Sequence, residues 1–151
     1  MSRRRSAHLT PSRTITVQIP ADPAQLIMLR SIAETVCLTA DFDIGTVTDI
    51  RIALDEAATI LMRHHTVGSI ITCQFVFDEQ NMRIRLSSIS ESATPFDIAD
   101  LGWHVLRAMT DDLATSAKPF DPRASGYPVE VRFARSRGRV STAPLPPDSP
   151  L

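Results

Sequence analysis

Apolar residues recur at helical spacing through the segment from Asp43 to His65, the longest patterned stretch of the chain. Their spacing of three and four residues places them on one face of a helix; they are Val47, Ile50, Leu54, Ala57 and Leu61. A second face repeats at the same spacing and carries Asp49, Ile52, Glu56, Ile60 and Arg63. The pattern predicts a central amphipathic helix with one face in the core and a carboxylate-bearing face beside it.

Strict alternation of apolar and polar residues predicts four strands, in segments 14–19, 69–77, 82–86 and 127–133. The second and third of these are joined by Asp78-Glu79-Gln80-Asn81, a run of turn-forming residues that predicts a hairpin. Helical spacing predicts two further helices, at about 23–38 and 101–113. The first of them begins at Asp22-Pro23, which are residue types favoured at helix starts.

The predicted elements follow the order β-α-α-β-β-α-β, and 151 residues suffice for one domain with its own core. Four strands with three helices on one face make an α/β (α+β) two-layer sandwich with a mixed or antiparallel sheet. Segments 87–100 and 116–126 are predicted loops. The domain is expected to span residues 14–133, between a disordered basic arm at 1–13 and a disordered Pro- and Arg-rich tail at 134–151.

Charge divides the chain into an acidic body and basic ends. Residues 14–131 hold 8 Lys and Arg against 16 Asp and Glu, while eight arginines lie in segments 1–13 and 132–139. An acidic body argues against DNA binding as the main function, because phosphate contacts dominate that affinity. Aromatic residues make up 5% of the chain, too few for a surface that stacks single-stranded bases. A weaker hypothesis remains, in which the arginine-rich ends contact nucleic acid.

Other features predict a cytoplasmic protein. No apolar run approaches the roughly 20 residues of a membrane span, and the start of the chain lacks the apolar region of a secretory signal. Cys37 and Cys73 fall in a predicted helix and a predicted strand, so reduced buried thiols are expected. Histidines and cysteines do not recur at metal-ligand spacing, and no metal site is predicted.

Two stretches give the chain a family resemblance: IRIALDEAAT (residues 50–59) in the central helix and LGWHVLRAMTDDLAT (residues 101–115). With the hairpin between them, they resemble the GHKL (Bergerat-fold) ATPases over about residues 14–133. Within that superfamily the chain is most similar to the anti-sigma factor kinases of bacterial stress and sporulation switches. The family's central helix carries a Glu followed four residues later by an Asn. Glu56 falls on that Glu, and the segment from Gly102 to Asp112 falls on the family's later motif.

The resemblance assigns a role to each residue type in the nucleotide site. In the family the Glu is a general base, the Asn oxygen binds Mg²⁺ with ATP, and an Asp-x-Gly-x-Gly turn holds adenine. Here Ile60 stands at the Asn position, and the chain after Leu86 reads SSISESATP, without glycine. The degenerate site therefore comprises Glu56, Ile60, Asp100 and Gly102. We expect no bound cofactor; ATP and Mg²⁺ belong to the alternative that activity survives.

Two functional hypotheses follow from the resemblance. The first is a regulator that sequesters an alternative sigma factor and is released by an anti-anti-sigma antagonist, with lost or weakened kinase activity. The predicted partner-binding residues are Asp49, Asp55 and Trp103, since an acidic body suits a basic partner surface. The alternative is an active ATP-dependent serine/threonine kinase of the anti-anti-sigma factor, with Glu56 as base. The resemblance also implies a homodimer, and neither hypothesis involves a membrane or direct nucleic-acid binding.

Overall fold

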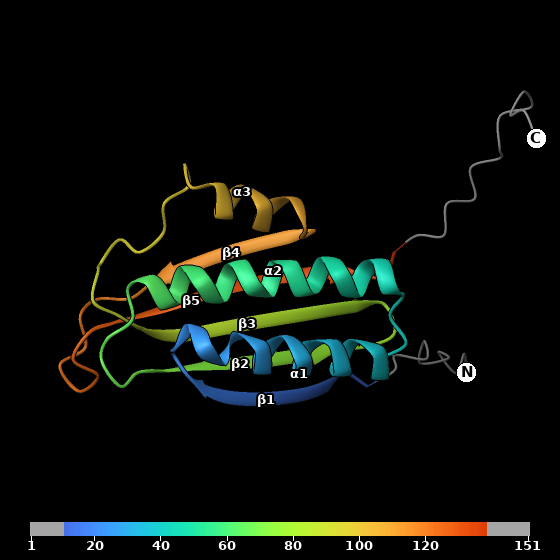
Figure 1. Ribbon diagram of the computed structural model, residues 1–151, viewed down its shortest axis with the longest axis horizontal. Helices are drawn as coiled ribbons and strands as arrows, with labels where there is room; N and C mark the ends of the chain where they lie inside the picture. Colours follow the sequence, from blue (N-terminus) through green and yellow to red (C-terminus); the bar gives the residue numbers. More distant parts are fainter. Residues whose placement is uncertain (1–10, 139–151) are drawn as a thin grey trace, which may run out of the picture.

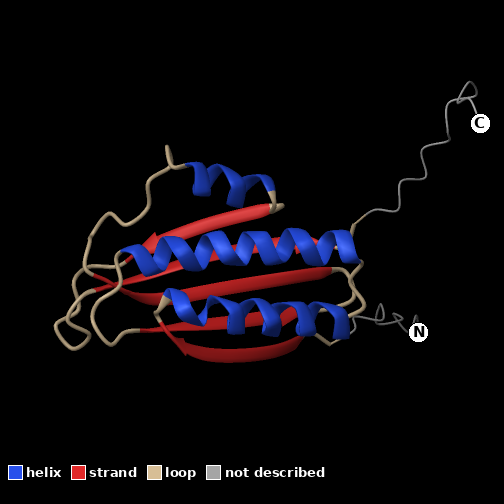
Figure 2. Cartoon of the chain, viewed as in Figure 1, coloured by secondary structure: helices blue, strands red, loops and turns tan. Residues whose placement is uncertain are grey.

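One antiparallel sheet and three α-helices on one of its faces form the two layers of the protein (Figures 1 and 2). The computed structural model describes residues 11–138. Its five strands lie in the order β1-β2-β3-β5-β4; they are β1 (Arg13–Pro20), β2 (Ile70–Phe77), β3 (Asn81–Ser90), β4 (Asp112–Ala117) and β5 (Tyr127–Ser136). The helices are α1 (Leu26–Thr39), α2 (Ile44–Arg63) and α3 (Leu101–Ala108), with a short 3-10 helix, η1 (Pro23–Gln25), before α1.

Helix α2 lies along the sheet between α1 and α3 (Figure 1) and buries its apolar stripe. Ile50, Leu54 and Ala57 are fully buried, as the spacing predicts. The side chain of Asp43 caps the helix by accepting a hydrogen bond from the amide of Thr46 at 3.1 Å. On the other side of the core, the inward faces of β2, β3 and β5 supply mostly Phe, Ile, Leu and Val side chains. The hairpin of β2 and β3 is confirmed by its register from Thr72↔Ser87 to Phe77↔Met82.

The predicted two-layer class, with all helices on one face, is confirmed, but the predicted number of four strands is wrong. Helix α3 ends at Ala108, and residues 112–117 form the edge strand β4 rather than the last turn of a helix and the start of a loop. Leu113 fitted the helical stripe, and the following Ala, Thr, Ser and Ala residues are too small to show a strand period. Pairing with β5, a partner distant in sequence, decides the conformation.

Strand β3 continues to Ser90, although residues 87–90 were predicted as loop. The polar serines hid the strand, because two of them point into the protein. The Ser88 hydroxyl donates to the carbonyl of Ile70 at 2.9 Å, and that of Ser90 donates to the carbonyl of Ser92 at 2.9 Å. Each buried hydroxyl thus has a partner, which lets serine replace an apolar residue in the inward row.

The domain boundaries predicted at residues 14 and 133 lie inside strands. β1 begins at Arg13, and β5 runs on to Ser136. Arg137 follows and holds three segments together. Its side chain donates to the carbonyls of Glu79 at 2.8 Å and Ala40 at 3.1 Å, and its guanidinium lies 5.2 Å from the ring centroid of Phe42. Part of the predicted basic tail is therefore structural; the prediction of disordered ends otherwise concerns residues 1–10 and 139–151, which lie outside the described residues.

Cys37 and Cys73 are unpaired and fully buried, in agreement with the sequence prediction of buried thiols. Burial disfavours the thiolate and raises the pKa of each thiol to about 12. Neither sulfur therefore has the low pKa and exposure of a reactive cysteine.

We expect Arg137→Ala to lower the free energy of unfolding by about 1–2 kcal/mol, because it removes two hydrogen bonds to loop carbonyls and a cation–π contact. The measurement is the urea midpoint at constant slope. Arg83→Ala is the matched control: Arg83 is exposed and forms none of the salt bridges found within residues 11–138, so its change should stay within about 0.5 kcal/mol. Equal midpoints for the two variants would contradict a structural role for Arg137.

Candidate functional site

Glu56 of α2 and Gly102 of α3 meet where the two helices approach each other. A Cβ atom placed on Gly102 would lie 2.6 Å from Oε2 of Glu56, closer than atoms pack. Glycine at this position therefore allows the first turn of α3 to lie against the carboxylate. The fold thus brings together two of the residues predicted for the degenerate nucleotide site, which are 46 positions apart in the sequence.

Asp100 lies beside this contact and joins the same two helices. It caps α3, its carboxylate accepting a hydrogen bond from the amide of Gly102 at 3.4 Å, and it forms an ion pair with Arg63 at the end of α2. The hydrogen bond from Arg63 holds the pKa of the Asp100 carboxyl below its usual range. The ion pair ties the start of α3 to the last turn of α2, across the region where the resemblance implies a nucleotide.

The side chain of Ile60 does not point toward the implied nucleotide site beside Glu56 and Gly102, as a magnesium ligand at this position would. Its side chain is 4% exposed and belongs to the hydrophobic core, although Glu56 one turn earlier is half-buried. Residues four apart on a helix lie about 40° from each other around the axis, so position 60 is at the boundary between core and cleft. An apolar side chain at that boundary turns inward and extends the core.

The residues around Glu56 do not fit a magnesium–nucleotide complex. Hard cations take oxygen ligands, and Ile60 has none to offer. The carboxylate of Asp100 is engaged by Arg63 and by the amide of Gly102. Segment 91–100 contains no glycine for a close backbone approach to phosphates, and its Phe96 packs against the core. Within residues 11–138, no cluster of three or more His, Cys, Asp or Glu side chains could hold a metal ion.

The two aspartates predicted to bind a partner are each paired with an arginine of the same chain. Asp55 accepts two hydrogen bonds from Arg30 of α1, at 2.8 and 2.9 Å. Asp49 pairs with Arg135 of β5 at 2.9 Å, and Arg135 also reaches Asp111 at 3.4 Å. A protein that binds this surface therefore meets ion pairs rather than free carboxylates.

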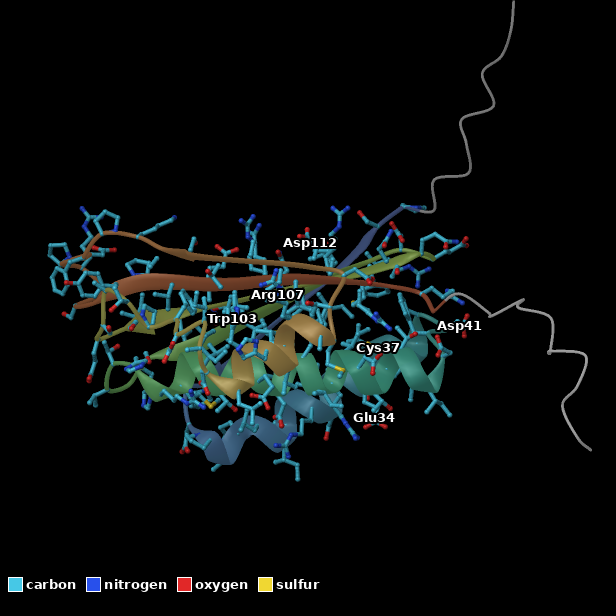
Figure 3. The ribbon with its side chains drawn as sticks, turned by 90° about the horizontal axis from the view of Figure 1, so that it is seen from above. Glu34, Cys37, Asp41, Trp103, Arg107 and Asp112 are labelled. Atoms are coloured by element: carbon cyan, nitrogen blue, oxygen red, sulfur yellow. The ribbon has the colours of Figure 1, made fainter. Side chains whose placement is uncertain are left out.

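Trp103, the third predicted partner-binding residue, is half-buried: it packs against the core from the start of α3. Figure 3 shows it at the surface beside Arg107, facing the viewer together with Asp112 of β4. The structure thus combines packing of Trp103 against the core with partial exposure of its side chain.

Sequence reasoning missed two residues that organise the site, Arg63 and Arg135. Arg63 was placed on the correct face of the central helix, but nothing in the sequence pointed to Asp100, 37 positions later, as its partner. Arg135 was assigned to a tail, and its contact with Asp49 spans 86 positions. Both contacts depend on helix and strand packing, which has no signature in local sequence.

Comparisons with known proteins give curated relatives but no family profile, since none matches the chain. The chain is 27% identical over 131 residues to the anti-sigma-F factor RsbW of Mycobacterium tuberculosis (strain H37Rv), covering 85% of this chain and 77% of that protein. It is 29% identical over 87 residues to the serine-protein kinase RsbW of Listeria monocytogenes (strain EGD-e), covering 56% of this chain and 54% of that protein.

The antiparallel sheet with helices on one face is the fold class that the resemblance to GHKL domains implies, and the carboxylate of α2 lies against the glycine of α3. Within that class, the chain is related to anti-sigma factors of the RsbW serine-protein kinase type. The family resemblance found in the sequence is thereby confirmed. No helix within residues 11–138 combines the length and the apolar character needed to cross a bilayer.

The lowered pKa of Asp100 predicts a pH dependence with a defined sign. The folded pKa lies below the unfolded value, so the pair with Arg63 stabilises the fold above about pH 4. That contribution is lost as the pH falls through the folded pKa. In Arg63→Met we expect the Asp100 carboxyl to titrate closer to the ordinary value of 3.8, as read from its ¹³C chemical shift.

Arg107→Met, the same change one turn after Trp103 on α3, is the control, and it should leave the Asp100 titration where it is in the unaltered protein. Acid unfolding provides a second reading, since Arg63→Met should lose less stability than the unaltered protein between about pH 5 and pH 2. An Asp100 titration that does not move in Arg63→Met would show that the ion pair is not formed in solution.

Proposed function

We propose that the chain is an anti-sigma factor that binds and sequesters a sigma factor and is released by an anti-anti-sigma antagonist. The observation that carries this proposal is the relationship to anti-sigma-F factor RsbW across 85% of the chain, over a described fold of the same class. Sequestration needs a folded binding surface and no chemistry. The chain retains the fold and Glu56, while Ile60 stands at the position of the family's magnesium ligand.

The proposal includes the loss or weakening of kinase activity. Two features of the described structure support this. Ile60 takes the position of the magnesium ligand and is buried in the core, and Asp100 is held by Arg63 at the mouth of the same region. Opening a phosphate site would require breaking that ion pair and would still leave no oxygen at position 60.

For the sigma-binding surface we propose the outer side of the helix layer, which includes Asp49, Asp55 and Trp103. The two aspartates are intermediate in exposure, and each is bound to an arginine. A basic partner surface can compete for such carboxylates, whose present pairs are partly open to solvent and therefore weak. We further propose a cytoplasmic protein that acts as a homodimer, with one domain over about residues 13–138.

The second candidate function is an ATP-dependent kinase acting on the antagonist. One observation favours it. The side chain of Glu56, the residue of α2 that the resemblance assigns as base, points to the first turn of α3 and lies against Gly102, the only glycine of α3. Its carboxylate forms none of the hydrogen bonds or ion pairs that occupy Asp49 and Asp55, within the described part of the chain. A general base needs such a free carboxylate.

We expect the purified full-length chain to bind at least one alternative sigma factor of its organism equally well with and without ATP and Mg²⁺. Pull-down followed by titration calorimetry measures the affinity in both conditions. Binding to none of these sigma factors would contradict the proposed function. Binding only in the presence of ATP and Mg²⁺ would instead favour a working nucleotide site.

In direct titration with ATP and Mg²⁺ we expect no saturable heat, and with radiolabelled ATP no transfer to candidate antagonists. If transfer does occur, Glu56→Gln should abolish it, while Glu79→Gln, the same change at an exposed residue of the β2–β3 turn, should leave it intact. Because Ile60 is buried, Ile60→Asn should lower the free energy of unfolding by about 2–4 kcal/mol. We expect that substitution not to create ATP binding by itself.

A further inference from the structure

The outer edge of β4 presents backbone groups that the sheet does not use. β4 is the last strand and pairs only with β5 (Figure 1). Just after the strand, the amide of Lys118 donates to the carbonyl of Pro128 at 2.9 Å, in continuation of the β4–β5 register. Successive residues of a strand point their N–H and C=O groups to alternate sides. Even-numbered residues of β4 therefore face β5, and the groups of Leu113, Thr115 and Ala117 point away from the sheet.

The β4 edge lacks two features that often prevent another strand from adding to a sheet, namely proline and lysine or arginine within the strand. Residues 112–117 read DLATSA, and their register with β5 is continuous from Asp112 to Ala117. The irregular pairing is limited to the start of the strand, where the amide of Asp111 donates to the carbonyl of Ala134 at 2.9 Å. The opposite edge of the sheet, β1, begins at Arg13 and ends at Pro20. An open edge of six residues is long enough to bind an extended peptide segment.

Helix α3 lies along this open edge, on the helix side of the sheet. In Figure 1, α3 lies beyond β4, outward from the centre of the sheet; Figure 3, seen from that side, shows Trp103 and Arg107 between α3 and the start of β4. A groove of about 440 Å³ lies where α3 ends and β4 begins, at one end of the open edge. Its lining residues, which define the α3–β4 groove, are Trp103, Arg107, Thr110, Asp111, Asp112 and Leu113.

The groove combines an apolar wall with a cation that has no partner in the described chain. Trp103 is half-buried and leaves part of its indole accessible. Arg107 is exposed and takes part in none of the salt bridges found within residues 11–138. The nearby Asp111 is already engaged, because it accepts hydrogen bonds from the amide and hydroxyl of Ser136 at 2.6 and 2.8 Å. A carboxylate from a partner molecule could form an ion pair with the guanidinium of Arg107.

We propose that an extended segment of a partner polypeptide adds to β4 in the α3–β4 groove. Its backbone bonds to the outward groups of Leu113, Thr115 and Ala117. Side chains two residues apart on a strand lie on the same face. One carboxylate side chain of the segment therefore pairs with Arg107, and an apolar side chain two positions away packs on Trp103. This surface shares Trp103 with the proposed helix-layer surface, extends from there onto β4, and does not depend on the identity of a sigma factor.

Two other occupants of the edge fit less well. The chain's own segment 139–151 contains Pro144, Pro146, Pro147 and Pro150, and proline has no N–H to donate to a strand ladder. A second copy that paired through its own β4 would bring a second α3 to the same side of the shared edge. The two helices would then compete for the space that one α3 already borders (Figure 1).

The test is an NMR titration of the ¹⁵N-labelled full-length chain with the synthetic peptide acetyl-Thr-Val-Thr-Glu-Thr-Val-Thr-amide. We expect saturable shifts at the amides of Leu113, Thr115 and Ala117 and at the indole of Trp103, with exchange of the three amides slowed about tenfold or more. The same peptide with Lys in place of Glu should bind about fivefold more weakly or worse. Saturable shifts confined to β1 or to the open sheet face would overturn the proposal, as would the absence of saturable shifts.

A pair of matched variants tests the backbone contact. Thr115→Pro removes an outward N–H of β4 and no β4–β5 bond, and we expect it to abolish peptide binding. Thr16→Pro removes an outward N–H of β1 by the same alternation and should bind as the unaltered protein does. Unchanged binding by Thr115→Pro, or loss in both variants, would overturn the proposal.

Arg107→Ala keeps the test decisive if Thr115→Pro fails to fold, because an exposed side chain can be removed with little effect on the fold. It should weaken binding of the Glu peptide about fivefold and leave binding of the Lys peptide unchanged or tighter. Equal affinities of this variant and the unaltered protein for the Glu peptide would contradict the ion pair. Protection of the three amides that rises with protein concentration, without peptide, would assign the edge to a second copy and overturn the proposal.

Discussion

The burial of α2 is the constraint on which the rest of the structure depends. Ten of its 20 residues are buried, and the helix contacts α1, α3 and the sheet. A helix enclosed on this many sides has only a narrow face for chemistry, and that face borders the core directly. Glu56 and Ile60 lie on opposite sides of that border, although they are one turn apart. The side chain at position 60 therefore decides whether this border of the helix offers an oxygen ligand or extends the core.

Ion pairs then fix the elements around α2. Arg30 joins α1 to α2, Arg63 joins α2 to the cap of α3, and Arg135 joins β5 to α2. Each pair is partly exposed, so each contributes modestly to stability. Together they set the positions of three elements against one helix. They also neutralise part of the acidic charge counted in the sequence, because Asp49, Asp55 and Asp100 are each paired with an arginine of the same chain.

The two edges of the sheet differ because of what lies beside them. β1 is bounded in its own sequence by an arginine and a proline, whereas β4 contains only small or apolar residues after Asp112. Helix α3 lies over the second edge and adds an indole and a guanidinium to it (Figure 3). An edge with open backbone groups and such side chains has the composition of a peptide-binding groove rather than of a protected sheet margin. The groove includes Trp103, the neighbour of Gly102 in the sequence, so it lies next to the contact between Glu56 and Gly102.

The sequence by itself determined the central helix, the hairpin of β2 and β3, the two-layer class and the family resemblance, because each rests on local periodicity or on a contiguous motif. Only the tertiary structure decided that residues 112–117 are a strand, that Arg135 and Arg137 belong to the fold, and that Asp100 pairs with Arg63. These features rest on contacts between residues 12 to 97 positions apart. Small side chains such as those of β4 carry no period of their own, so their conformation follows from the strand beside them. Long-range ion pairs leave no local pattern at all, because only chain packing brings their charges together.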